Sequence, residues 1–139
     1  MATRLPLTAL AAALAVALAA APALAASCVP PAGFEPHARL ESAGVVLFFR
    51  IVPAPVEVGR HFALETVVCA APAPHGLRVS ADMPEHRHGM NYRVETSAAP
   101  DGRFVSEGFL FHMPGRWRLV FEVARDGRTE RLTADLAVE

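Results

Sequence analysis

Two short segments of the chain hold thioether and imidazole side chains close together in the sequence. The six residues of these segments that could bind a metal ion are Met83, His86, His88, Met90, His112 and Met113. Methionine is commonly an adaptable apolar filler of cores, but here it lies among proline, glycine, histidine and arginine, where chains turn. Thioether and imidazole together form a soft ligand set, which favours copper over hard cations, and Cu(I) in particular.

The spacing within the first segment suits a shared ion. His86, His88 and Met90 follow one another at alternate positions, and alternate residues project to the same side of an extended chain. His112 and Met113 would complete the ligand shell from the second segment. Two neutral imidazoles with one or two thioethers suit three- or four-coordinate Cu(I), whereas an all-nitrogen set suits Cu(II) or zinc better.

Each of these residues also has a simpler interpretation. Met90 and Met113 could be apolar plugs that close the end of a fold, and His112 could be a hydrogen-bonding residue of a turn. The same segments could instead form a contact surface for another protein, because methionine adapts its shape to a partner. The other histidines, which have no motif around them, are interpreted as surface or structural residues: His37, His61 and His75.

The chain lacks the sequence patterns of common hydrolases. It has no His-Glu-x-x-His helix and no Gly-x-Ser-x-Gly elbow. The closely spaced histidines are also not continued into the ligand set of a metallo-hydrolase or of a copper/zinc dismutase. The sequence therefore predicts a binding protein, not an enzyme.

The first 25 residues are typical of an export signal. Arg4 supplies a positive charge, residues 5–21 are almost unbroken apolar sequence, and Ala-Leu-Ala at 23–25 matches a cleavage site. The apolar run is also long enough to remain as an uncleaved membrane anchor, although the Ala-Leu-Ala ending favours cleavage. We expect a periplasmic protein with an irregular lead-in over residues 26–43 and one domain over residues 44–139.

The charge balance excludes two classes of partner. Lysine is absent, and without Arg4 the formal net charge is about −2. This balance gives neither the basic footprint of a nucleic-acid-binding domain nor a polybasic patch for a membrane surface.

Cys28 and Cys69 are the only cysteines. An exported chain meets an oxidising environment, so the simpler interpretation is one disulfide that ties the N-terminal segment to the domain. The alternative is lipid attachment at Cys28, because the preceding Ala-Ala-Ser loosely resembles a lipoprotein processing sequence. Either that lipid or an uncleaved N-terminal segment would anchor the protein to a membrane.

Nothing after residue 30 has the periodicity of a long helix. Proline and glycine recur at short intervals, and β-branched or aromatic residues fill the runs between them. Seven runs are predicted to be strands: 45–52, 61–69, 77–82, 92–97, 103–111, 116–124 and 129–138. Short strands separated by turn signals favour an all-β fold, an immunoglobulin-like antiparallel β-sandwich. Trp117 alternates with Leu119 and Phe121, which predicts that it points into the core.

Alternating strand direction predicts which connections share an end of this sandwich. With antiparallel neighbours, the connections after the first, third and fifth strands lie at one end. The third and fifth connections contain the two segments with methionine and histidine, so we expect both at the same end. Cys69 closes its strand at the opposite end, near the point where the segment with Cys28 enters the domain.

These two segments also resemble a known family. DMPEHRHGMN at 82–91 and GFLFHMPGRW at 108–117 are similar to the paired motifs of the YtkA-like domain, a family related to the FixH group. The resemblance covers residues 45–138 and implies an immunoglobulin-like sandwich outside the cytoplasm, with associations to copper handling and respiratory oxidase assembly. FixH proteins normally keep a membrane anchor, from which the Ala-Leu-Ala ending departs. The residues that match the family motifs are Met83, His86, His88, Met90, His112, Met113 and Trp117.

The sequence thus leads to one main hypothesis and two alternatives. The main hypothesis is an exported copper-binding module, a Cu(I) carrier or chaperone that serves a copper-receiving or oxidase-assembly partner. The ligands are expected to be His86, His88, Met90 and Met113, with His112 and Met83 as neighbours or substitutes. The first alternative is a non-metal protein-interaction domain that uses the same segments as its contact edge. The second is a structural domain whose loops only close the sandwich.

Overall fold

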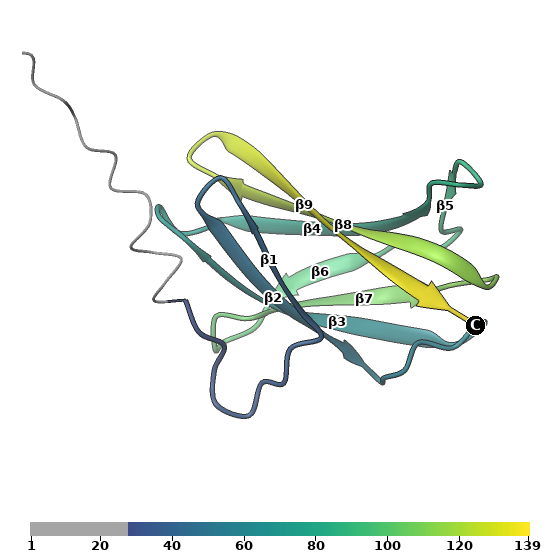
Figure 1. Cartoon of the computed structure of the whole chain (residues 1–139). Helices are drawn as coiled ribbons and strands as arrows, with labels where there is room; N and C mark the ends of the chain where they lie inside the picture. The colour runs from purple at the N-terminus through teal and green to yellow at the C-terminus, as the bar shows by residue number, and fades with distance from the viewer. Residues whose placement is uncertain (1–27) are drawn as a thin grey trace, which may run out of the picture.

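A computed structural model describes residues 28–139, which form two antiparallel β-sheets packed face to face (Figure 1). The five-stranded sheet has the order β1 (Ala38–Ser42), β2 (Val45–Val52), β3 (His61–Ala70), β7 (Phe104–Leu110) and β6 (Glu95–Ala98). The four-stranded sheet has the order β5 (His88–Gly89), β4 (Gly76–Met83), β8 (Gly115–Arg125) and β9 (Arg128–Val138). The predicted all-β, immunoglobulin-like sandwich is confirmed.

The predicted signal peptide, residues 1–25, lies outside the described residues. Between residues 28 and 139 there is no helix long and apolar enough to cross a membrane.

The core lies between the two sheets and follows from the alternation of side chains along each strand. In β8, the side chains of Trp117, Leu119, Phe121 and Val123 are all at 0% exposure. From the opposite sheet, the Phe49 ring lies 5.1 Å from the Phe121 ring, measured between centroids. Burial of each large apolar side chain contributes about 1.5–3 kcal/mol. The predicted inward orientation of Trp117 is confirmed.

Strand β2 is buried on both faces over its first five residues. Its outward side chains, Val46 and Phe48, pack against Cys28 and Phe34 of the N-terminal segment. The Cys28–Cys69 disulfide joins Cα atoms 6.0 Å apart and holds that segment on the outer face of the five-stranded sheet. The predicted disulfide is confirmed, and the Cys28 sulfur that a lipid would modify is bonded to Cys69.

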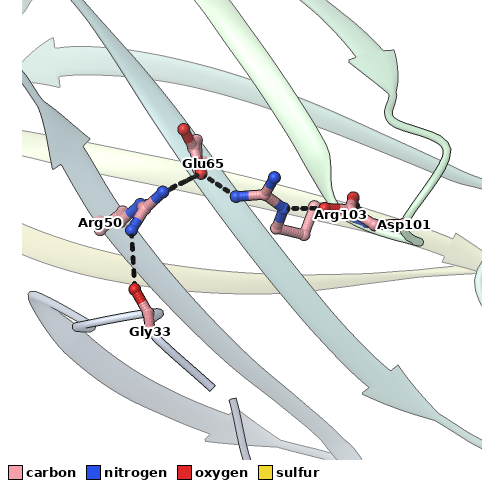
Figure 2. Close-up of polar contacts among 5 residues, drawn as sticks. All are labelled: Gly33, Arg50, Glu65, Asp101 and Arg103. Carbon is pink, nitrogen blue, oxygen red and sulfur yellow. Dashed lines mark hydrogen bonds and ion pairs between the residues drawn. The ribbon is translucent and has the colours of Figure 1, made fainter. Parts of the chain in front are cut away.

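A polar network also anchors the N-terminal segment (Figure 2). The Arg50 guanidinium donates to Glu65 through Nε at 3.1 Å and Nη2 at 2.8 Å, and to the Gly33 carbonyl through Nη1 at 3.3 Å. Arg103 donates to the same Glu65 oxygen and, through Nε at 2.6 Å, to Asp101. Two arginines therefore share one half-buried carboxylate, and one of them reaches across to the segment that covers the sheet. The backbone N–H of Arg103 also donates to Asp101, which holds the pKa of that carboxyl below its usual range.

Two strands correct the sequence-based expectations. The lead-in expected to be irregular over residues 26–43 contains β1, which pairs with β2 through a tight turn where Ala43 and Gly44 have φ of 47° and 76°. The segment expected to be a loop contains the short strand β5. Both strands are short: β5 has two residues, and β1 alternates apolar with charged residues only at Ala38 and Leu40, so neither pattern is long enough to predict a strand. The sandwich therefore has nine strands where about seven were expected.

The connections lie at the two ends of the sandwich as the alternating strand direction predicted. The β2–β3, β4–β5, β5–β6 and β7–β8 connections lie at one end, together with the carboxyl end of β9 (Figure 1). The disulfide and the β3–β4, β6–β7 and β8–β9 connections lie toward the other. We refer to the first of these as the histidine end.

Candidate functional site

The β4–β5 hairpin positions the first pair of imidazoles. Its turn is closed by the His86 and Arg87 N–H groups, which donate to the Met83 carbonyl at 3.1 and 2.9 Å. Arg87 has a φ of +57° there, so the turn carries one left-handed residue. In the ladder His88 pairs with Met83, and directly paired residues project to the same face of a sheet. His88 is therefore directed toward the inner side of the sandwich.

The β7–β8 connection positions the second pair of candidate ligands. The Trp117 indole Nε1 donates to the Met113 carbonyl at 3.0 Å, and the Phe111 ring stacks on Trp117 with centroids 4.2 Å apart and planes within 5°. These contacts fix the backbone on both sides of His112. A buried tryptophan thus sets the shape of an exposed loop.

The histidines of the two segments meet at the rim of the sandwich. The His88 ring centroid lies 5.8 Å from that of His86 and 5.3 Å from that of His112. Both His88 and His112 also lie over Trp117, at 6.0 and 5.4 Å between centroids and near right angles to it. Residues 24 positions apart in the chain are therefore neighbours in space, as the strand parity predicted.

This spacing is compatible with a shared metal ion. A metal bound by an imidazole nitrogen at about 2 Å lies about 3 Å from the ring centroid, so two imidazoles on one ion have centroids about 5–6 Å apart. The His88–His112 and His86–His88 pairs both lie in that range.

One hydrogen bond also sets the tautomer of His88. Its Nδ1 lies 3.1 Å from the Gly89 carbonyl oxygen. A carbonyl only accepts, so Nδ1 is the donor, and Nε2 is the ring nitrogen that takes no part in this hydrogen bond. A ring N–H that donates to a backbone carbonyl is the usual support of a metal-binding histidine.

The three methionines differ in their surroundings. Met83 is at 0% exposure within the main core, and a Cβ placed on Gly115 would lie 2.7 Å from its Cε. Met90 and Met113 are half-buried at the edge of the same core. The structure therefore favours a core role for Met83 over a ligand role and leaves the other two thioethers at the rim, beside the imidazoles in sequence.

Charged groups surround the imidazoles unevenly. Arg116 pairs with Asp135 at 2.9 Å and Glu85 at 3.0 Å, and these hydrogen bonds raise the pKa of Arg116 above its usual value. Arg87 and Arg93 are exposed and have no acidic partner among residues 28–139. Two exposed arginines, Arg87 and Arg93, therefore lie close in sequence to His86 and His88 without an ion pair among the described residues.

Two further aromatic side chains, His61 and Tyr92, lie at the histidine end. His61 begins β3, its Nδ1 lies 3.2 Å from the Phe109 carbonyl, and its ring meets the Tyr92 ring edge-on at 5.6 Å. The sequence analysis treated His61 as surface or structural. Its hydrogen bond to a backbone carbonyl is compatible with a structural role.

The fold and the site together define a β-sandwich with an imidazole-rich, thioether-containing rim. In the described part of the chain, no group of three or more His, Cys, Asp or Glu side chains is already arranged to hold a metal ion. Comparison with protein-family models, with curated proteins and with solved structures gives no match.

Proposed function

We propose that this protein is an exported copper-binding module of the YtkA-like type, which carries Cu(I) in the periplasm. The ligands are His88 and His112 from the two loops, with His86 as a third imidazole and Met90 and Met113 as thioethers. The observation that carries the proposal is the distance of 5.3 Å between the ring centroids of His88 and His112, which come from separate segments of the chain.

The donor set supports copper in its reduced state. Cu(I) accepts two to four soft ligands, and a mixture of neutral imidazole and thioether suits it better than it suits magnesium, calcium or zinc. Nε2 of His88, which takes no part in the hydrogen bond to Gly89, is the nitrogen proposed to bind the ion at the central position.

The exposure of the rim supports a carrier role. His86 and His112 are exposed, and His88 is half-buried. Ligands from a recipient, for which a respiratory-oxidase assembly protein is our candidate, can therefore replace the imidazoles one at a time. The thioethers, packed against the core, would hold the ion during this exchange.

A second candidate function is a non-metal protein-interaction domain that uses the same loops. Its support is Tyr92, which is 47% exposed at the histidine end. Tyrosine is enriched at protein interfaces, where its ring supplies contact area and its hydroxyl a hydrogen bond. This function requires a partner but no copper.

The experiment that tests copper binding is a Cu(I) titration against a competing chelator, with zinc and Cu(II) in parallel. The wild type should bind one Cu(I), and His86→Ala/His88→Ala should lose that binding without a change in thermal stability. His75→Ala is the matched control, because His75 is also exposed but lies in the β3–β4 connection at the far end. His112→Ala should weaken binding strongly, since the site uses both loops. Retention of wild-type affinity by the double variant would refute the proposal.

A further inference from the structure

A groove of about 340 Å³ runs along one edge of β4, beside the imidazoles. Residues 78–81 of β4 form one wall, and five residues between Gly89 and Val94 form the other. Gly89 and Met90 belong to both features, because they line the groove and directly follow His88. Whatever occupies the groove therefore lies next to the proposed copper ligands.

The β4 wall of the groove presents backbone hydrogen-bonding groups without a strand partner. Pairing of β4 with β5 covers only Asp82 and Met83, and the Ala81 carbonyl accepts one further bond from the Met90 N–H at 3.3 Å. Backbone groups alternate in direction along a strand, so Val79 directs its N–H and C=O to the same side as Ala81. No strand pairs with Val79 there within the described residues. The edge is thus able to accept an added strand.

Gly108 explains why the chain itself does not close this edge. A Cβ on Gly108, which has a φ of +97°, would clash with the Arg93 carbonyl oxygen. The absence of that Cβ lets Arg93 and Val94 rest directly on β7, in the other sheet. Because the segment after β5 is held on β7, it cannot pair with β4, and the groove remains between them.

The side chains of the groove indicate the chemistry of its occupant. No aspartate or glutamate is among the lining residues. Arg93 has no acidic partner, while Arg78 on the opposite wall is paired with Glu122. Tyr92, 47% exposed, adds an aromatic surface. Unpaired positive charge, an aromatic ring and a free strand edge together fit an extended segment with carboxylates.

We propose that this groove binds an extended, acidic segment of a partner protein by β-strand addition to β4. The partner's main chain pairs with the backbone of Val79, and its carboxylates face Arg93. A partner bound in the groove lies within reach of the proposed copper ligands. Only this link to copper transfer rests on the proposed function. Docking at the groove would then precede ligand exchange at the rim.

The test uses a capped hexapeptide of alternating valine and glutamate as the probe, added to ¹⁵N-labelled protein without copper. We expect amide shifts confined to residues 77–81 and 89–94. A peptide with lysine in place of glutamate should give no such shifts. Arg93→Glu should lower the affinity for the glutamate peptide by about tenfold or more. Arg128→Glu is the matched control, because Arg128 is exposed in the β8–β9 hairpin at the other end, and it should leave the affinity within about twofold.

Three outcomes would overturn the proposal. These are the absence of shifts at millimolar peptide, shifts centred on another edge such as β9, and equal weakening by Arg93→Glu and Arg128→Glu. The peptide should bind His86→Ala/His88→Ala as it binds the wild type. A loss of peptide binding and a loss of copper binding can therefore be observed independently, so each proposal can be refuted without the other.

Discussion

Substitution of Met83 and Met113 provides the sharpest test of which methionines pack in the core and which bind copper. Met83 is completely buried beneath Gly115, so Met83→Ala removes a core side chain and leaves a cavity. The surrounding walls are β8 backbone and fully buried side chains, which collapse poorly. We therefore expect a loss of about 3 kcal/mol, within the range of about 2–5 kcal/mol for such truncations.

This loss converts into a measurable change in melting temperature. Unfolding entropy is about 2.1 cal/mol/K per residue, or about 0.24 kcal/mol/K for a domain of about 110 residues. A loss of about 3 kcal/mol then lowers Tm by about 12 °C. Far-UV circular dichroism during heating measures this shift. Cu(I) affinity, measured by competition below the lowered Tm, should stay near the wild-type value.

Met113→Ala is the matched variant, because Met113 is only half-buried and lies at the rim. Its expected loss of stability is about 1 kcal/mol, while Cu(I) affinity should fall by about tenfold or more as a thioether ligand is lost. The reasoning is refuted if Met83→Ala melts within about 3 °C of the wild type. It is refuted equally if Met83→Ala loses copper and Met113→Ala keeps it.

Three more predictions follow from the described contacts. Cys28→Ser/Cys69→Ser opens a loop with a sequence separation of 41, and urea unfolding should show a loss of about 4 kcal/mol. Hydrogen bonds from Arg118 hold the pKa of Asp135 below its usual range. The stability that this carboxylate contributes near neutral pH is lost as the pH falls through that lowered pKa, so Asp135→Asn should lose less stability than the wild type in an acid titration followed by circular dichroism. Trp117→Phe removes the indole hydrogen bond that fixes the β7–β8 loop; a competition titration should show weaker Cu(I) binding with unchanged stoichiometry.

Much of the fold could be predicted because its strands carry strong patterns. The predicted run 45–52 coincides with β2, and 61–69 differs from β3 by one residue. Turn signals at Pro, Gly and Asp separated the other long strands correctly. Strand parity then predicted the common end of the two Met/His segments, because antiparallel neighbours leave little freedom in where connections lie.

The short edge strands could not be predicted from the same patterns. Strand β1 reads Ala-Arg-Leu-Glu-Ser, and its alternation extends over only two apolar residues, Ala38 and Leu40. It forms because the N-terminal segment is tied across the sheet by the disulfide and by Arg50. That constraint depends on contacts distant in sequence, which local periodicity does not contain.

The burial of Met83 was not predicted, and this has a simpler physical origin. The third predicted strand stopped at residue 82, since Pro84 is a turn signal, and Met83 was therefore grouped with the loop. Strand β4 instead includes Met83, and alternation from Val79 and Ala81 then directs its side chain into the core. An error of one residue at a strand end thus grouped a buried methionine with the residues of the loop.

The arrangement of the rim explains how the proposed copper ligands, although exposed or half-buried, can still be well positioned. His88 belongs to a strand pair, and His112 follows a buried phenylalanine that stacks on Trp117. Their backbones are thus fixed by the ladder and the core, while their side chains extend past the last layer of buried residues. Because these backbones are already fixed, binding of an ion there would cost little conformational entropy, which favours affinity. It nevertheless remains open to solvent on the side of His86, and this opening is what an incoming partner requires for exchange.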